Sequence, residues 1–225
     1  MIKVQKIFVM AALVLIPSVS FAQKVNILTE KTASNREQYA AEYLQKKLNR
    51  LGFPTVVNGK KGEYRISLSQ AKDTAGLKKE GFSWTRKGKK IQLQGNDGSG
   101  VIYGCNEIAE YVAQHGSLNV PLMQEDAPEM VLRGACVGLQ KTVYLPGHTR
   151  IYEYPYTPEN FPWFYDKEQW IQYLDMLVDN KMNSLYLWNG HPFASLVKLK
   201  DYPFALEVDE ATFKKNEEMF SFLTK

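Results

Sequence analysis

The chain has 225 residues, of which 44% are hydrophobic and 23% charged, and its formal net charge is +4. The basic residues are scattered, and the one local cluster, at residues 86–90, has Gly88 in its middle and is expected to be a solvated hairpin tip. No aromatic-basic stripe accompanies it and the three histidines are widely spaced, so the sequence argues against a nucleic-acid partner and gives no pattern for a metal or other cofactor.

Residues 1–22 have the organisation of a signal peptide. Two lysines precede an apolar stretch at residues 7–16, and Ser20-Phe21-Ala22 is a small-x-small cleavage site. The stretch is too short to cross roughly 30 Å of hydrocarbon, and Gln23 rather than Cys follows the cut. The alternative for this stretch is a buried strand or helix. The sequence predicts cleavage after Ala22 and an exported chain, periplasmic or extracellular, without a membrane anchor.

The next segment, residues 23–124, is expected to begin with a strand at residues 25–28. Ser34 and Glu37 form a capping box, which predicts a helix that ends at Leu51-Gly52. Further strands are predicted over residues 54–57 and 64–68.

A hairpin is then predicted over residues 81–94, around the turn at Gly88, and Asn96-Asp97-Gly98 predicts a turn before a second helix. This order favours an α+β domain with a mixed or antiparallel sheet that carries both helices on one face. We expect most of its strand pairs to be antiparallel.

Residues 121–129 are polar and bounded by prolines, so a domain boundary is expected there. The mostly apolar run at residues 131–137 is typical of a buried parallel strand. Asp166 is expected to cap a helix, residues 184–188 to form a second strand, and Asp209 to cap a last helix.

Strand, helix, strand, helix is the beginning of a parallel α/β unit. Residues 125–225 are too few for a (β/α)8 barrel, which takes about 250 residues. The sequence therefore predicts a truncated barrel, and a chain that is the N-terminal part of a longer protein.

Two cysteines occur, Cys105 in a predicted helix and Cys136 in a predicted strand. Export permits a disulfide between them, but two cysteines make no disulfide framework. Both have apolar neighbours, which favours two buried free thiols.

Several segments resemble a known group of enzymes. The run at residues 42–48, Gly95-Asn96-Asp97-Gly98 and Val101-Ile102-Tyr103-Gly104 resemble the accessory domain that precedes the barrel in family 20 β-N-acetylhexosaminidases and family 67 α-glucuronidases. Residues 128–134 resemble the entry to the first barrel strand of the hexosaminidases, and residues 174–183 resemble the first barrel helix and its exit. The resemblance implies an exported glycoside hydrolase that acts on a glycan.

Family 20 enzymes use an Asp-Glu pair, in which the glutamic acid protonates the leaving oxygen and the aspartate steadies the acetamido nucleophile of the substrate. Family 67 enzymes resemble the two-carboxylate inverting scheme. The resemblance places both sets of carboxylates beyond this stretch, so no catalytic residue is assigned and the fragment alone is expected to be inactive. The hexosaminidase pattern of His and an acidic pair after the second strand is replaced by Trp188-Asn189-Gly190-His191, which puts N-acetylhexosamine specificity in doubt.

Four residues are candidates for substrate binding. The resemblance implies that Arg133 holds sugar hydroxyls through its fork of donors, and the alternative is a structural ion pair near the barrel floor. Trp188, Asn189 and His191 follow the second predicted strand, on the face where barrel active sites are built. Trp188 could stack on a sugar and Asn189 could bond its hydroxyls, whereas the alternatives are a core Trp188 and a His191 that caps a loop.

The segment between the two predicted barrel strands is rich in aromatic residues, namely Tyr152, Tyr154, Tyr156, Phe161, Trp163, Phe164 and Tyr165. These rings could form sugar-stacking walls or pack against the accessory domain. A capping role explains Asp166 and helix-start electrostatics explain Glu168, so neither is expected to be catalytic.

Two further hypotheses remain beside the enzyme. One is a non-catalytic carbohydrate-binding protein on the same fold, and the other is an interaction module confined to residues 23–124. Carboxylates beyond Lys225 would separate the enzyme from the binding protein.

Overall fold

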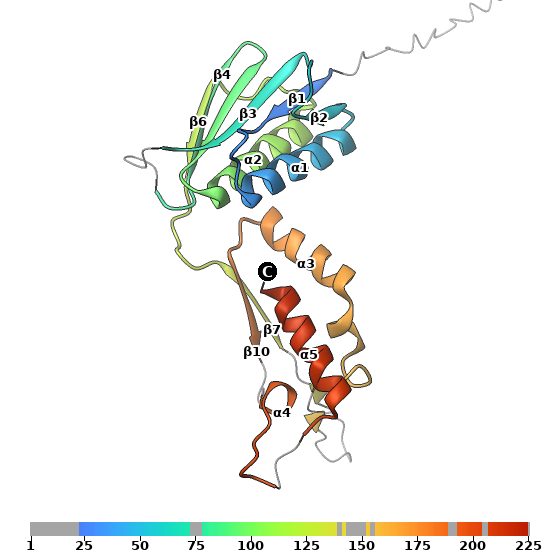
Figure 1. Ribbon diagram of the computed structural model, residues 1–225. Coiled ribbons are helices and arrows are strands. Elements are labelled where there is room, and N and C mark those ends of the chain that lie inside the picture. The colour runs from blue at the N-terminus through green and yellow to red at the C-terminus, as the bar shows by residue number, and fades with distance from the viewer. Residues whose placement is uncertain are drawn as a thin grey trace, which may run out of the picture.

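The computed structural model describes residues 23–72, 78–138, 141–142, 152–153, 156–188, 193–203 and 207–224. The predicted signal peptide lies outside these residues. Figure 1 shows a sheet-and-helix N-terminal domain above a C-terminal part that contains β7, β10, α3 and α5. Within the described residues, no helix is both long and apolar enough to span a bilayer.

The N-terminal domain contains one sheet and two helices. Its elements are β1 (Val25–Leu28), α1 (Asn35–Arg50), β2 (Thr55–Val57), β3 (Tyr64–Gln70), β4 (Phe82–Lys87), β5 (Lys90–Gly95), α2 (Gly98–His115) and β6 (Met123–Asp126). Both helices lie on one face of the sheet, as predicted (Figure 1).

The sheet is mixed, with strand order β2-β1-β3-β5-β4-β6. β1 is parallel to β2 and β3, and β3 is parallel to β5, whereas β4 is antiparallel to β5 and β6. The expectation of a largely antiparallel sheet is therefore wrong. β5, rather than β4, lies beside β3. The predicted hairpin therefore joins the sheet through its second strand, which is parallel to β3. β6 was expected to be part of a polar boundary segment and instead forms an edge strand on β4.

The helix boundaries follow the predicted caps. The Ser34 hydroxyl accepts a bond from the Glu37 backbone N–H and the Glu37 carboxylate accepts one from the Ser34 N–H, which confirms the capping box. The turn at the other end of α1 contains Gly52, with a φ of 85°. Asp97 caps α2 by accepting a bond from the Gly100 N–H at 2.9 Å.

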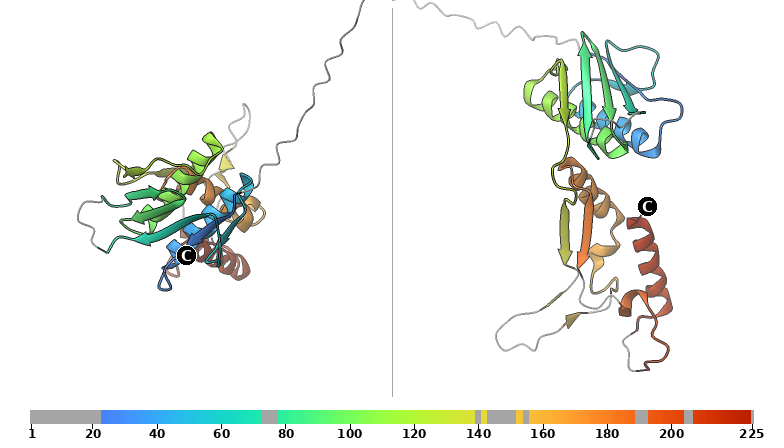
Figure 2. Two further views of the ribbon diagram at one scale, coloured as in Figure 1. Left: turned by 90° about the horizontal axis from the view of Figure 1, so that it is seen from above. Right: turned by 90° about the vertical axis from the view of Figure 1, so that its left-hand side faces the viewer.

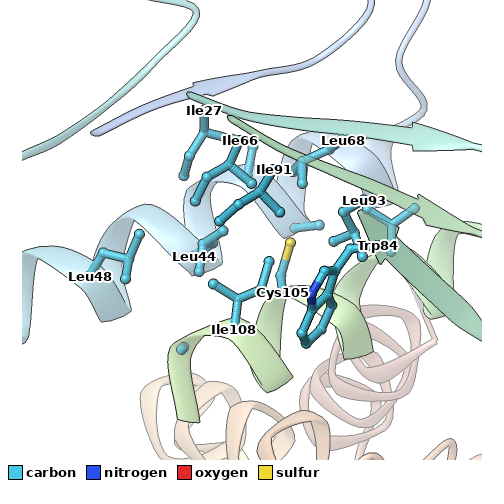
Figure 3. Packing of buried hydrophobic residues seen from close by; sticks show 14 of the residues in the cluster. Ile27, Leu44, Leu48, Ile66, Leu68, Trp84, Ile91, Leu93, Cys105 and Ile108 are labelled. Atoms are coloured by element: carbon cyan, nitrogen blue, oxygen red, sulfur yellow. The ribbon is translucent and has the colours of Figure 1, made fainter. Parts of the chain in front are cut away.

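The core of this domain lies between the sheet and the two helices. Ile66, Ile91 and Leu93 of the sheet are almost fully buried. Figure 3 shows them facing Leu44 of α1 and Cys105 of α2. This arrangement buries the two helix stripes that the apolar spacing predicts.

Replacing Gly100 with Ala is expected to destabilise the protein by about 1–3 kcal/mol, against the usual helix preference for Ala. A Cβ at Gly100 would lie 2.1 Å from the Gly81 carbonyl oxygen, a backbone atom that cannot rotate away. Urea unfolding would measure the change. Gln114→Ala, on an exposed position of the same helix, is the matched control and should change stability by less than about 0.5 kcal/mol. Equal stability of Gly100→Ala and wild type would contradict the close approach.

The C-terminal part contains one parallel strand pair with a helix between the strands in sequence. Its elements are β7 (Gly134–Gly138), β8 (Lys141–Thr142), β9 (Tyr152–Glu153), a 3-10 turn (Pro162–Tyr165), α3 (Lys167–Asp179), β10 (Ser184–Trp188), α4 (Phe193–Leu196) and α5 (Glu210–Leu223). β7 and β10 pair in parallel, with Gly134 opposite Ser184 and Trp188 opposite Gly138. Asp166 caps α3 and Asp209 caps α5, as predicted.

The first strand of this part is more exposed than its composition predicts. Its residues alternate between exposed and half-buried, and Cys136 is exposed. The expectation of two buried thiols is correct for Cys105 and wrong for Cys136. The reason is that successive side chains of β7 point to opposite faces: Val137 packs against the second core, whereas Cys136 lies on the other face, which no described element covers.

A thiol-reactive reagent is therefore expected to label Cys136 quickly in the native chain and Cys105 only after unfolding. Both are free. Burial raises the pKa of Cys105, which suppresses its thiolate in addition to blocking access. Timed alkylation followed by mass spectrometry of peptides would measure the two rates. Comparable native rates at both cysteines would contradict this prediction.

Candidate functional site

The carboxyl ends of β7 and β10 lie side by side. Their parallel register places the backbone of Trp188 opposite Gly138, each at the last position of its strand. Figure 2 shows both strands running away from the N-terminal domain, so these carboxyl ends lie at its far side. The Trp188 side chain, Asn189 and His191 lie outside the described residues. Of the four predicted binding residues, Trp188 is therefore placed at this end of the strand pair by its backbone.

Arg133 lies at the opposite end, directly before β7. Its Nη2 lies 2.8 Å from Glu80 Oε2 and 3.3 Å from the Tyr103 hydroxyl. Its Nε donates to the Lys181 carbonyl at 2.8 Å and its Nη1 to the Met130 carbonyl at 2.6 Å. Every nitrogen of the guanidinium thus has a protein acceptor.

This geometry contains the ion pair that the sequence offers as the alternative to a sugar-binding role for Arg133. Its side chain is 13% exposed and that of Glu80 is 11% exposed. Burial disfavours the charged guanidinium, but the hydrogen bond and charge of Glu80 outweigh it and hold the pKa of Arg133 above its ordinary value. The guanidinium donors bond to Glu80 and Tyr103 of the N-terminal domain and to the carbonyls of Lys181 and Met130.

Glu80 is the shared acceptor of this junction. Besides Arg133, its carboxylate accepts from the Asn183 amide at 3.0 and 3.2 Å. Its backbone N–H donates to Asp97 Oδ2 at 3.0 Å, and its φ is 59°, an uncommon value for a residue with a side chain. The turn before β4 is thus held in a strained conformation that directs a carboxylate at the C-terminal part.

A second set of contacts joins α1 and α2 to α3. The Tyr39 hydroxyl donates to Asp175 at 2.9 Å, and the Tyr43 hydroxyl lies 2.5 Å from Asp179. Lys47 forms an ion pair with Asp179 at 2.6 Å. Burial and the hydrogen bonds to these aspartates raise the pKa of both tyrosines, which therefore remain protonated donors.

The exit of α3 is fixed by α2. Asn106 donates to the Asp179 carbonyl at 2.8 Å, and Lys181 forms an ion pair with Glu107 at 2.7 Å. Burial disfavours the ammonium of Lys181, but Glu107 outweighs it and raises its pKa. The N-terminal ends of the two strands and the end of α3 are therefore all attached to the N-terminal domain.

Comparison with known proteins identifies that domain. Residues 15–125 match the family model described as glycosyl hydrolase family 20, domain 2. A solved structure of a GH138 enzyme targeting pectin rhamnogalacturonan II is 58% identical, with a TM-score of 0.77, over 89% of this chain and 29% of that chain.

The N-terminal domain is a glycoside hydrolase accessory domain.

Two further solved structures match the chain at low identity, and the first of them shares its fold. A family GH115 4-O-methyl-α-glucuronidase with specificity for decorated arabinogalactans is 13% identical, with a TM-score of 0.57, over 89% of this chain and 28% of that chain. A β-N-acetylhexosaminidase from Bacteroides fragilis NCTC 9343 is 15% identical, with a TM-score of 0.49, over 89% and 38% of the two chains. No curated protein matches the chain. The chain spans less than a third of the GH138 and GH115 structures.

The aromatic segment packs neither as a wall at the carboxyl ends nor against the accessory domain where it is described. Tyr156, Phe161 and Phe164 are at most 2% exposed and pack with Trp170 of α3 and Met219 of α5. They form the second core of the chain, which supports α3 and α5. The side chains of Tyr152 and Tyr154 lie outside the described residues.

Sequence reasoning did not find the contacts between the accessory domain and α3. One signal was available, because Tyr39 and Tyr43 are four residues apart on one helix and Asp175 and Asp179 are four apart on another. Such spacing places each pair on one face, so that two donors can meet two acceptors across adjacent turns. Nothing in the sequence marks Glu80, whose partners come from residues 97–183.

Proposed function

We propose that this chain is the N-terminal part of an exported glycoside hydrolase that acts on a pectin-type glycan. The observation that carries the proposal is the 58% identity to a GH138 enzyme targeting pectin rhamnogalacturonan II over 89% of the chain. The identity extends well beyond the accessory domain that the family model matches, which ends at residue 125. The sequence of residues 1–22 supports export.

The unit β7-α3-β10-α5 is, in this proposal, the beginning of a (β/α)8 catalytic barrel. Two features of the geometry support it. β7 and β10 are parallel and separated by a helix, as barrel strands are. In addition, a mostly apolar hollow of about 370 Å³ lies between β7 and α3, lined by no residue of β10. Its lining residues are Val137, Trp163, Gln169, Trp170, Gln172, Tyr173 and Met176. A further strand and helix of the barrel would fill it.

Within this barrel, Trp188, Asn189 and His191 are the substrate-binding candidates. The backbone of Trp188 ends β10, and active sites of barrel enzymes are built on the loops that follow the strands. The catalytic carboxylates would come from later strands, so the stretch up to Lys225 binds part of the substrate without cleaving it. The similarity to the GH138 enzyme favours a pectin glycan over the N-acetylhexosaminide and glucuronide substrates that the first resemblance implied.

The test uses the encoded protein with whatever sequence follows Lys225. It should release sugar from rhamnogalacturonan II, measured by anion-exchange chromatography, and leave chromogenic N-acetylglucosaminide and glucuronide uncleaved. Hydrolysis of either chromogenic substrate, without activity on the pectin, would overturn the substrate assignment. The mature N-terminus, determined by mass spectrometry after secretion, should be Gln23.

The binding residues can be tested in the same protein. Trp188→Ala should raise KM for the pectin substrate at least about tenfold. Loss of an aromatic ring that stacks on a ligand ring costs on the order of 1–3 kcal/mol, as measured for nucleic-acid bases, and we expect a similar cost for a sugar. Leu122→Ala removes an apolar side chain that is 64% exposed in the accessory domain and is the matched control. An unchanged KM for Trp188→Ala would remove this residue from the site.

The second candidate is a non-catalytic carbohydrate-binding protein on the same fold. It predicts saturable binding of pectin fragments without release of sugar over a broad substrate panel.

A further inference from the structure

The face of the accessory sheet that points away from α1 and α2 is uncovered by any described element. Both helices lie on the other face, where α3 approaches them (Figure 1). The face of the sheet that carries α1 and α2 is therefore occupied by the core of the domain and by its contacts with the C-terminal part. The outer face is free to meet a ligand.

The centre of this outer face is polar and uncharged. The alternation along the strands directs six side chains outward in two rows that the register aligns across β3, β5 and β4. They are Ser67, Gln92 and Thr85 in one row, and Ser69, Gln94 and Ser83 in the other. These six, together with Leu28, Thr29, Glu30, Leu68 and Trp84, line a hollow of about 370 Å³. Within the described part of the chain, none of the six side chains forms a hydrogen bond to another protein group.

A row of cations borders the hollow. Arg65, Lys90 and Lys87 are aligned by the same register and are all exposed. They lie one outward position from the first polar row, about 7 Å along the strands. None of the three forms an ion pair with a described residue, whereas the neighbouring Lys89 is paired with Glu63 at 3.1 Å. Two carboxylates also lie at this face: Glu30 lines the hollow, and Glu125 lies opposite Ser83, level with the second polar row rather than with the row of cations.

We propose that this outer face binds a segment of an acidic oligosaccharide. A sugar carboxylate would lie on the row of Arg65, Lys90 and Lys87, and the hydroxyls of the adjoining sugar would bond to the amides and hydroxyls of the hollow. The unpaired cations can bind the carboxylates of such a sugar chain, and the neutral donors and acceptors beside them can bind its hydroxyls. This inference rests on the proposed function, and it gives the accessory domain a role in holding an acidic glycan such as pectin near the enzyme.

The experiment measures binding of a short oligogalacturonide to the 225-residue chain by isothermal titration calorimetry. The comparison ligand is the same oligosaccharide with its carboxyls reduced to alcohols. Wild type should bind the acidic ligand more tightly than the neutral one, with an affinity that falls as salt is added. Equal affinity for both ligands, or no binding of either, would overturn the proposal.

Two variants locate the site. Arg65→Gln/Lys90→Gln should weaken binding of the acidic ligand at least about tenfold, and Gln92→Ala/Thr85→Ala should weaken binding of both ligands. The matched control is Lys46→Gln/Lys215→Gln, which removes the same charge from exposed positions of α1 and α5. An equal loss in the control would show general attraction to a cationic protein and would overturn the site.

Hydrolysis by the full enzyme distinguishes this inference from the proposed function. Arg65→Gln/Lys90→Gln should leave turnover of a small soluble substrate unchanged, because the outer face lies on the far side of the sheet from the C-terminal part. Binding without hydrolysis in wild type would overturn the enzyme and leave the glycan site. Hydrolysis without binding to the outer face would overturn the glycan site and leave the enzyme.

Discussion

Replacing Glu80 with Ala is expected to lower the free energy of unfolding by about 3 kcal/mol. The change leaves the Arg133 guanidinium largely buried without its counter-ion and removes the acceptor of the Asn183 amide. The φ of 59° is as unfavourable for Ala as for Glu, so the difference reports on the lost carboxylate rather than on the backbone. Urea unfolding followed by fluorescence would measure it.

Two further variants test the cause of that loss. Glu63→Ala removes an ion pair whose side chains are 52% and 54% exposed, and it should cost less than about 0.5 kcal/mol. Adding Arg133→Leu to Glu80→Ala should recover part of the stability, because the uncompensated charge is then absent. If the double variant is less stable than Glu80→Ala, Arg133 stabilises the junction mainly through its bonds to the Lys181 and Met130 carbonyls.

Replacing Phe164 with Ala should cost about 3–5 kcal/mol and affect the C-terminal part first. Phe164 is fully buried, with ring centroids of Tyr156 at 4.9 Å and Phe220 at 5.6 Å. Its removal leaves a cavity that joins the 3-10 turn, α3 and α5, and it also removes the edge-to-face contact with Trp170.

The measurement is the unfolding transition followed by tryptophan fluorescence and by far-ultraviolet circular dichroism. Ile171→Ala is the matched control, since this side chain is 42% exposed on α3, directly after the 3-10 turn, and its removal should cost less than about 1 kcal/mol. A Phe164→Ala protein as stable as the control would contradict the second core.

Local signals in the sequence predicted the helices well. Ser34, Asp166 and Asp209 each cap the helix that the sequence predicts for them, because capping depends on only three or four consecutive residues. Asp97, in the turn predicted before the second helix, also caps that helix. The apolar stripes then determined which face of α1 and α2 is buried. These elements could be predicted because their causes are local.

The strand order could not be predicted in the same way. The hairpin of β4 and β5 was recognised from its turn at Gly88, but no local signal says which of its strands joins β3. The short polar sequence of β6 resembles a linker, and its pairing with β4 depends on the end of α2 bringing it to that edge. The sequence thus did not predict strand pairing across long separations, because that pairing depends on tertiary contacts rather than on local residues.

The candidate site was predicted only in part. The position of Trp188 at a strand end followed from the run of apolar residues, whereas the partner of Arg133 is Glu80, 53 residues away. An arginine beside a barrel strand has the same sequence whether it faces a sugar or a carboxylate. Only the arrangement of the two domains distinguishes these roles.

The separation of the two cores has a spectroscopic consequence. The chain has four tryptophans, of which Trp84 lies in the accessory core and Trp163, Trp170 and Trp188 belong to the C-terminal part. The variant Trp84→Phe would therefore have tryptophan emission only from the C-terminal part. A variant that keeps Trp84 and replaces the other three tryptophans with Phe would have emission only from the accessory domain. The order in which the two parts melt, or whether they melt as one, can then be observed directly with light.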